Sequence, residues 1–350
     1  AGWYRGDFHA HTNFSDGFQS PPNLVEVARA EGLDFFAITD HNTIEAYAEF
    51  GKVTDIVIIP GLEVTLDIGH YNIFGIEGTP DWLPDVCVWP APLPSLAGRY
   101  KTPSELMQRT AGQGLLNSIN HPLLPPWDWL DTETDLRYVH CLEIWNDPSW
   151  PDNVRGNPRA VALWTRWLNQ GYRITAIGGS DYHRPYPKPG ENKPAERLGL
   201  PSTFVYAEEL SGAAILAGIR ERRAYVSMGP LVTFQAFSGD AVHDIGADLG
   251  SLTGDIQFRG TVSHKTPVRV RVLKNGDVAA RADLEAGNGE LSYKDVSTGG
   301  EPAWYRLDVL DQHGHILAVT NPIFVGTPKK SSVRTYGDFV DGQSEAETQI

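Results

Sequence analysis

Side chains that can bind a metal ion stand at or just after the ends of several predicted strands. The first two are histidines one residue apart, in the N-terminal segment WYRGDFHAHTNFSDG. Positions i and i+2 of an extended chain point to the same side, so an HxH or DxH pair can hold one ion with two side chains. The candidate ligands are His9, His11, His41, Glu63, His121, Glu143, Asp181 and His183.

This mixture of residue types indicates which metals are suitable. Neutral imidazole and carboxylate ligands together suit zinc, manganese or iron, and the set is too rich in nitrogen for a calcium site. A carboxylate such as Glu63 can bridge two ions. Two ions about 3.5 to 4 Å apart lower the pKa of a shared water and stabilise the attacking and leaving oxygens. The pattern therefore predicts hydrolase chemistry.

The elements that must position these residues are parallel βαβ units, which the sequence predicts up to about residue 230. Helices are predicted over 21–30, from the capping box at 102–105 to about 113, and from Asn157-Pro158 to Gly171. The predicted strands are DFHAH, LDFFAITDH, DIVIIPGLEVTL with an interruption at Pro60-Gly61, GHYNIFGI, GLLNSINHP, CLEIWN and YRITAIGGSDYH. In a βα barrel the carboxyl ends of the strands converge on one face, where active sites form.

The pattern changes after Pro230. Short alternating strands and turn signals at Asn275-Gly276 and Asn288-Gly289 predict an antiparallel β-sandwich of immunoglobulin size. We therefore divide the chain into an α/β domain over 1–230 with a surface insertion at 78–100, a β-sandwich over 231–327 and a polar tail over 328–350. Gly178 and Gly179 precede Asp181 and indicate a close approach of the backbone to another group.

Composition excludes some classes of partner. The chain has 350 residues and a formal charge of −15, which disfavours a nucleic-acid partner. No apolar run has the length of a membrane span, so we expect a soluble chain without a membrane partner. It begins at Ala1 without a basic-then-apolar leader, and both a cytoplasmic and an exported location stay open. Two cysteines are too few for a disulfide framework, and either two buried thiols or one bridge is compatible with them.

Six motifs carry a resemblance to a known family. HAHTNFSDG, ITDHNT, PGLEVT, NHP, LEIWN and GGSDYH, in this order, resemble the motif series of the polymerase and histidinol phosphatase (PHP) superfamily. The HxH motif alone is weak evidence for this superfamily, since amidohydrolase sequences also begin with it. The later TDH and GSDxH motifs make the set of motifs specific. The resemblance covers about residues 1–230. It implies a distorted (β/α)7 barrel, within an α/β fold class, that holds up to three metal ions.

The resemblance also implies a division of the ligands. One ion would be held by His9, His11, Glu63 and Asp181, a second by Glu63, His121 and Glu143, and a third by Asp16, His41 and His183. Many family members carry a different residue where Glu143 stands. WN after Glu143, and the stretch IRERRAYVSMGP before a β domain, look most like the branch that includes carbaryl-hydrolase-like enzymes. Carbaryl is an aryl carbamate, so this branch weakens an automatic assignment to phosphate esters.

Other residues have a structural interpretation beside the functional one. His70 and His140 are as compatible with a hydrogen-bonded core as with the site, and Asp16 alone is compatible with a turn before Gly17. Arg184, next to His183, is a candidate for binding a substrate anion. The other cations of its loop, Lys188, Lys193 and Arg197, are typical of a solvated segment, as are His313 and His315. For aromatic pocket walls we select Trp127 and Trp145.

Together these features predict a metal-dependent hydrolase with two to three divalent ions (Mn, Zn or Fe). A metal-bridging hydroxide would attack a small phosphomonoester or phosphodiester, with Asp181, His183, Arg184 and His70 as catalytic residues. The alternatives are an aryl ester or carbamate hydrolase and a non-catalytic metal- or ligand-binding protein. The substrate is expected to be a small anionic ester, and the oligomeric state stays open.

Overall fold

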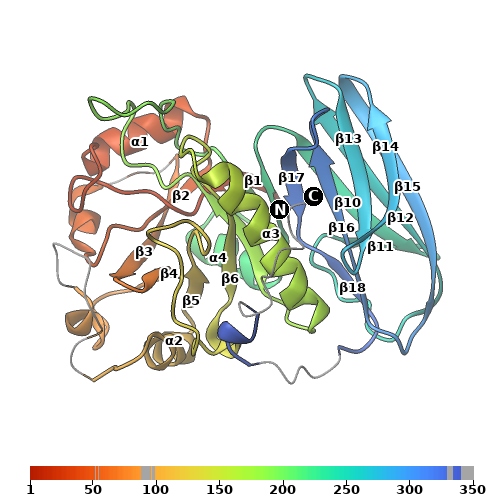
Figure 1. The fold of residues 1–350 in the computed structure, drawn as a ribbon, viewed down its shortest axis with the longest axis horizontal. Coiled ribbons are helices and arrows are strands. Elements are labelled where there is room, and N and C mark those ends of the chain that lie inside the picture. The colour runs from red at the N-terminus through yellow and green to blue at the C-terminus, as the bar shows by residue number, and fades with distance from the viewer. Residues whose placement is uncertain (52, 54, 88–95, 97–98, 329–333, 340–350) are drawn as a thin grey trace.

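The structure is a computed structural model that describes residues 1–51, 53, 55–87, 96, 99–328 and 334–339 (Figure 1). The N-terminal part mixes helices with parallel strands, as the sequence predicts. Nine strands lie in this part: β1 (Gly2–Asp7), β2 (Phe35–Ile38), β3 (Val57–Leu66), β4 (Gly69–Phe74), β5 (Leu116–Ile119), β6 (Cys141–Asn146), β7 (Thr175–Gly179), β8 (Ser202–Ala207) and β9 (Ala224–Ser227).

The strands β1 to β7 are neighbours in sequence order. Pairing is parallel from β1 to β3 and from β5 to β7, and antiparallel on both sides of β4. A parallel bridge between Ala10 and Tyr182 joins the segment after β1 to the segment after β7. The carboxyl ends of β1 and β7 are therefore adjacent, while the closed (β/α)7 barrel stays a prediction.

Helices cover this sheet: α1 (Pro21–Ala30), α2 (Pro103–Gly112), α3 (Asn153–Asn169) and α4 (Gly212–Arg220). The predicted bounds of α1 are confirmed, and Thr102 accepts a hydrogen bond from the Glu105 amide at the start of α2, as the capping box requires. The predicted start of the third helix is wrong, because α3 begins at Asn153 and Pro158 lies inside it. Pro158 leaves the Val154 carbonyl without its helical partner, and this is tolerated because Val154 is exposed to solvent.

Two predicted strand limits also differ from the structure. The strand β1 ends at Asp7, so His9 and His11 lie in the irregular segment that follows it. The strand β3 runs without interruption through Pro60 and Gly61. Pro60 keeps its place in the sheet opposite Ile38, and its carbonyl accepts a hydrogen bond from the amide of Gly75.

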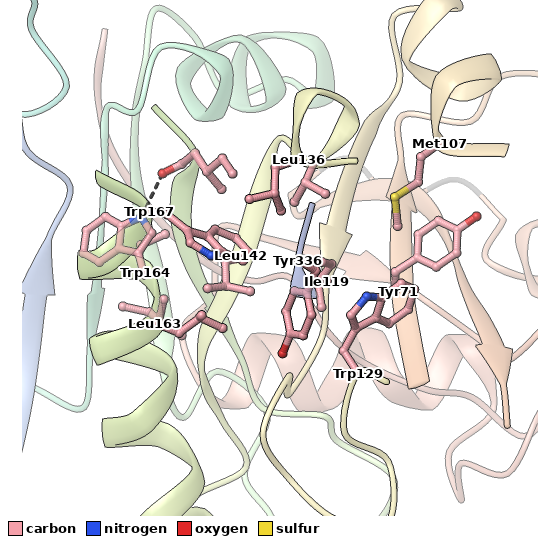
Figure 2. Packing of buried hydrophobic residues seen from close by; sticks show 14 of the residues in the cluster. Tyr71, Met107, Ile119, Trp129, Leu136, Leu142, Leu163, Trp164, Trp167 and Tyr336 are labelled. Atoms are coloured by element: carbon pink, nitrogen blue, oxygen red, sulfur yellow. Dashed lines mark hydrogen bonds between the residues drawn. The ribbon is translucent and has the colours of Figure 1, made fainter. Parts of the chain in front are cut away.

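The largest apolar cluster of the described residues includes side chains of α3 and of the strands β4 to β6 (Figure 2). Trp164 and Trp167 are fully buried, and the Trp164 indole donates to the carbonyl of Ile174. Tyr336 and Phe339 also belong to this cluster. The described part of the predicted polar tail, residues 334–339, thus packs into the core and ends in the short 3₁₀ helix η4 (Gly337–Phe339). The rest of the tail, 329–333 and 340–350, lies outside the described residues.

The C-terminal region is antiparallel, in agreement with the predicted β domain. One sheet has the order β11-β10-β12-β15, and β14-β13-β16-β17 continues through β9 into the N-terminal strands. The two share one apolar cluster. The bounds are β10 (Leu231–Ser238), β11 (Ala241–Asp244), β12 (Thr253–His264), β13 (Val268–Lys274), β14 (Asp277–Leu284), β15 (Gly287–Thr298), β16 (Ala303–Leu310), β17 (Ile316–Thr320) and β18 (Ile323–Val325).

Of the two predicted turns, one is confirmed and one is wrong. Asn275 and Gly276 both have positive φ and join β13 to β14. Asn288 and Gly289 lie inside β15, where they pair with Ser263 and Val262 of β12. The long neighbouring strand supplies a full set of partners, so the local turn preference is overridden. The proposed domain limits and the immunoglobulin-like sandwich stay predictions.

Three further sequence features can be placed. In the predicted surface insertion at 78–100, Trp82, Leu83 and Val86 are buried around the 3₁₀ helix η2 (Leu83–Asp85), and residues 88–95 and 97–98 lie outside the described part. Both cysteines are free, with Cys141 buried. Two more 3₁₀ helices are η1 (Glu45–Glu49) and η3 (Leu136–Tyr138). No helix in the described ranges is long and apolar enough to cross a membrane.

Candidate metal centre

The candidate ligands, with His70 included, lie on or just after seven neighbouring strands, β1 to β7. Glu63 belongs to β3, His70 to β4 and Glu143 to β6, while the HxH pair follows β1 and the DxH pair follows β7. Four groups of their side chains have ligand atoms within 4.8 Å of one another. These groups are His9–His11–Asp181, His9–Glu63–His121, His41–Glu63–His70 and His11–Asp16–His41–His183. Residues far apart in the sequence therefore form one continuous cluster.

Glu63 stands at the centre of this cluster, and its side chain is fully buried. Its Oε1 atom lies 3.2 Å from His9 Nε2 and 3.5 Å from His121 Nε2. Its Oε2 atom lies 2.7 Å from His41 Nδ1 and 3.7 Å from His11 Nε2. The two oxygens thus face different imidazoles, which is the arrangement a carboxylate needs to bridge two ions.

Glu143 lies beside the cluster but is in none of the four groups. Its Oε1 atom is 2.9 Å from His9 Nδ1, and its Oε2 accepts a hydrogen bond of 2.7 Å from the amide of His121. The Nδ1 side of the His9 imidazole therefore contacts a carboxylate, and its Nε2 atom lies 3.3 Å from Asp181 Oδ1. Such a carboxylate orients a ligating histidine and raises its basicity.

Asp16 lies on the side of the cluster that faces solvent, and 46% of its side chain is exposed. Its Oδ1 atom lies 3.1 Å from His183 Nε2 and 3.4 Å from His41 Nε2. The turn that carries Asp16 is held by Asp40, which accepts hydrogen bonds from the amide and hydroxyl of Thr12. Asp16 is therefore a member of a group of four ligands, as well as a turn residue.

The backbone around the site is strained at two candidate ligands. His121 has φ 27° and Asp181 has φ 50°, values that side-chain-bearing residues rarely adopt. Gly179 supports the predicted close approach, because a Cβ atom there would lie 2.4 Å from His9 Cβ and 2.9 Å from Glu143 Oε1. A Cβ atom at Gly178 would lie 2.6 Å from Val226 Cγ1.

The charges of the cluster set the protonation states of its members. Burial and the imidazoles of His183 and His41 lower the pKa of His11 to about 3. Burial opposes the charged form of His183, but the hydrogen bond to Asp16 and the charge of Asp181 raise its pKa to about 10. Although burial works against ionisation, neighbouring imidazoles hold the pKa of Asp181 well below its usual range. The carboxylates are ionised, and a bound cation would replace the imidazole protons that balance them.

Buried nitrogen atoms without a hydrogen bond show that the cluster fits a metal ion. Within the described ranges, His9 Nε2 and His70 Nδ1, the nitrogen atoms that face Glu63, are buried and form no hydrogen bond. An unsatisfied buried polar atom is costly, and a divalent ion would provide the missing partner. Nitrogen and carboxylate donors in this ratio suit zinc, manganese or iron.

Several residues that support the cluster were missed by the sequence reasoning. Asp7 is fully buried and accepts hydrogen bonds from the amides of His9, Ser180 and Gly199, so it joins the segments after β1 and β7. Asn120 donates to Glu63 Oε1. The signals were the acid two residues before His9 and the polar residue just before His121.

Asn146 and Thr65 are two more supporting residues. Asn146 Nδ2 donates to Glu143 Oε2 at 3.1 Å and lies 3.4 Å from Asp181 Oδ2. The hydroxyl of Thr65 is 2.6 Å from His41 Nδ1. Asn146 belongs to the motif LEIWN and Thr65 to the motif PGLEVT, but nothing in the sequence indicates that their side chains reach the candidate ligands.

The remaining candidates fall into two classes. His70 joins the cluster, whereas His140 lies apart and its Nδ1 accepts a hydrogen bond from the Asn117 amide. Arg184 is half-buried, and its amide donates to Glu196. His313 and His315 are exposed, as the sequence predicts.

Lys193 and Trp127 show how the loop after His183 is packed. Lys193 is not solvated as expected, because its ammonium pairs with Glu196 at 2.8 Å and lies over the ring of Trp150. Trp127 packs edge-on against the same ring, with the centroids 5.2 Å apart. Trp150 therefore joins the loop to the segment that follows His121.

Comparisons with known proteins agree with this geometry over part of the chain. The sequence model of the PHP domain family matches residues 7–130. An uncharacterized protein of Methanocaldococcus jannaschii is 26% identical over 136 residues, which are 35% of this chain and 69% of that protein. A 5'-3' exoribonuclease of Haemophilus influenzae is 39% identical over 62 residues, which are 17% of this chain and 23% of the enzyme.

Among solved structures, one similar chain is a two-domain protein of Bacteroides vulgatus that contains a predicted PHP-like metal-dependent phosphoesterase. It is 18% identical, with 92% of this chain and 95% of that chain covered and a TM-score of 0.47. None of these comparisons supports the carbaryl-hydrolase-like branch in particular. Residues 7–130 of this chain are therefore similar to the PHP domain, and this similarity together with the four groups of candidate ligands among the described residues supports a metal-dependent hydrolase.

Proposed function

We propose that this protein is a metal-dependent phosphoesterase that acts on small phosphomonoesters or phosphodiesters. The observation that carries the proposal is the central position of Glu63, whose two oxygens face separate sets of imidazoles. When bound, divalent ions supply positive charge for the oxygens of the ester and lower the pKa of water. We assign two to three ions to this cluster.

The residues of the chain would hold these ions in three places. His9, His11 and Asp181 form one set, and Glu63 with His121 forms a second. Asp16, His41 and His183 form the third, which faces solvent through Asp16. Glu143 acts in this proposal as the carboxylate that orients His9, because its distances are to His9 Nδ1 and the His121 amide. The open side at Asp16 is the side from which an ester would enter.

Three residues contribute to substrate binding and proton transfer in this proposal. Arg184 follows His183 directly and is half-buried, so its guanidinium is a candidate partner for a phosphate oxygen. His183 contributes through the ion that it would hold with Asp16 and His41, because this ion would stabilise negative charge on the leaving oxygen. His70 lies 3.4 Å from Glu63 Oε1 and belongs to none of the three sets, so it is the candidate for moving a proton.

The proposal is tested by comparing three substrates on manganese- and zinc-loaded protein. These are a nitrophenyl phosphomonoester, a nitrophenyl phosphodiester and a neutral nitrophenyl carboxylate ester. The blank is His183→Ala, and the matched control is His315→Ala, since His315 is an exposed histidine outside the cluster. We expect turnover of a phosphate substrate by the wild type and the control, with none by the blank.

The other results would decide between the alternatives. Turnover of the neutral ester alone would replace the phosphoesterase proposal with an aryl ester or carbamate hydrolase. Metal binding without turnover of any of the three substrates would favour the non-catalytic protein. Equal activity of His183→Ala and wild type would show that hydrolysis does not occur at this cluster.

A further inference from the structure

A second site is indicated by a cleft of about 1430 Å³ between α3 and the strands β13 and β14. In Figure 1, α3 runs along the boundary between the N-terminal strands and the C-terminal sheet. Arg155 and Arg159 line the cleft from α3, and Arg269, Arg271 and Arg281 line it from the two strands. Within the described ranges no aspartate or glutamate lines it. Arg269 is paired with Asp283 at 2.8 Å, and the other four arginines give this wall positive charge in a chain of formal charge −15.

Some of these arginines form like-charge pairs, and their mutual repulsion is unfavourable for folding. Arg271 and Arg281 are direct partners across β13 and β14. Arg155 and Arg159 are four residues apart on α3, so they share one helix face. Like charges at these spacings are destabilising. Among the residues that the structure describes, neither Arg155 nor Arg281 forms an ion pair, so a bound anion would relieve the repulsion at both walls.

Part of this charge is fixed in place by the core. Arg271 lies 3.2 Å from Asp308, a fully buried carboxylate that also binds Arg306 at 2.9 Å. One carboxylate therefore serves two guanidinium groups, and a positive charge remains in excess. A guanidinium held in this way is pre-organised for a second acceptor, and arginine's planar donor fork suits phosphate oxygens.

Apolar side chains complete the wall. Val154 and Val278 line the cleft and are 69% and 51% exposed, and Met228 and Ile316 lie beside them. Trp145 forms another part of the wall. Exposed apolar surface between cations favours a ligand with an apolar or aromatic body as well as anionic groups. A bare inorganic anion would leave these side chains without a partner.

The cleft is close to the metal centre but separate from it. Asn153 and Asn157 line it, and both donate hydrogen bonds to Asn146. Asn146 in turn contacts Glu143 and Asp181, as described above. No member of the four ligand groups lines the cleft.

We propose that this cleft binds an organic polyanion, with two or more phosphate groups on an apolar or aromatic body, of the size of a nucleotide. Arg155 of α3 and Arg281 of β14 bind the phosphates from opposite walls, and the exposed valines and Trp145 contact the body. The inference does not depend on the hydrolase activity. A long nucleic acid is disfavoured by the overall charge of the chain.

Calorimetric titration of the full-length, metal-loaded protein tests the proposal. The probe is α,β-methylene-ADP, which resists hydrolysis between its phosphates, and methylenebisphosphonate and adenosine represent its two parts. The test variant is Arg155→Ala/Arg281→Ala, and Arg155→Lys/Arg281→Lys keeps the charge. The control is Arg137→Ala/Arg259→Ala, which removes the same charge from two exposed arginines outside the cleft. Hydrolysis of a nitrophenyl phosphate is measured in parallel.

We expect α,β-methylene-ADP to bind more tightly than either part. The alanine variant should weaken its binding about tenfold or more, with a smaller loss in the lysine variant. The control variant and the hydrolysis rates should stay unchanged. Absence of binding, equal affinity in the alanine variant, or an equal loss in the control would overturn the proposal. Binding of α,β-methylene-ADP by a wild-type protein that hydrolyses no nitrophenyl phosphate would count against the proposed function and leave this site intact.

Discussion

His9 Nδ1 lies 2.9 Å from Glu143 Oε1, a contact that favours an orienting role for a carboxylate that the family resemblance assigned to a metal ion. The same carboxylate accepts a hydrogen bond from the His121 amide. Glu143 thus binds two neighbours of the cluster and has no place in the four ligand groups. In the proposed function, its effect on metal binding passes through the orientation of His9 and His121.

Replacing Glu143 distinguishes a residue that orients the metal ligands from a residue that binds the metal itself. Glu143→Gln should weaken metal affinity about 10- to 100-fold while the number of ions at saturation stays the same, because only an orienting contact is lost. Metal content by mass spectrometry and a competition titration with a chelator measure both quantities. A loss of one equivalent of metal at saturation would instead show that Glu143 is a ligand.

Asp181 and His183 are predicted to be indispensable for hydrolysis. Asp181→Ala and His183→Ala should each lower kcat/KM by about a hundredfold or more, since removal of a ligand costs at least as much as removal of a supporting partner. Circular dichroism should show that both variants remain folded. Wild-type activity in both would remove these residues from the site.

Gly179 is predicted to be required for the approach of β7 to His9. In Gly179→Ala the new methyl group would meet His9 Cβ at 2.4 Å, and we expect destabilisation by about 1–3 kcal/mol with loss of metal affinity. The matched control is Gly112→Ala at the end of α2, where a Cβ atom has no neighbour within 4 Å. Thermal unfolding and metal titration of both variants provide the measurement. Equal behaviour of the two variants would contradict the prediction.

His140 provides a pH dependence of stability that is independent of the metal centre. Burial and the charge of Arg220 lower the pKa of His140 to about 4, from 6.5 in the unfolded chain. Between these values the unfolded chain binds more protons. The free energy of unfolding should therefore fall as the pH falls from 6.5 to 4, by up to about 3 kcal/mol from this residue.

The variant His140→Asn tests this dependence, because its side-chain oxygen can still accept the hydrogen bond from the Asn117 amide but does not titrate. Urea unfolding in a chelator at pH 7, 6, 5 and 4.5 should show a shallower slope for the variant than for the wild type. Identical slopes would show that His140 does not contribute.

Arg184 is predicted to select anionic substrates. Arg184→Ala should raise KM for a nitrophenyl phosphate about tenfold and change KM for a neutral ester little, because only the phosphate loses a charge-assisted hydrogen bond. Steady-state kinetics on both substrates, with Arg197→Ala as a control from the same loop, provide the test. If both substrates are affected to the same degree, Arg184 does not bind the phosphate.

The sequence by itself determined the ligand types and much of the local structure. Strand-end histidines and acids, the capping box at Thr102 and the Asn275-Gly276 turn depend on chemistry within a few residues. Such signals can be read from the chain because the physical cause lies within one element. The match to the PHP domain over 7–130 is in agreement with the motif series that carried the resemblance.

Only the tertiary structure decided which side chains meet. Glu143 and His9 are 134 residues apart, and their contact depends on the order of β1, β6 and β7 in the sheet. The cleft arginines come from α3 and from β13 and β14, whose packing no local pattern predicts. The sequence could not show that Asn288 and Gly289 belong to a strand or that Tyr336 is buried either, because long-range pairing and burial override local preference.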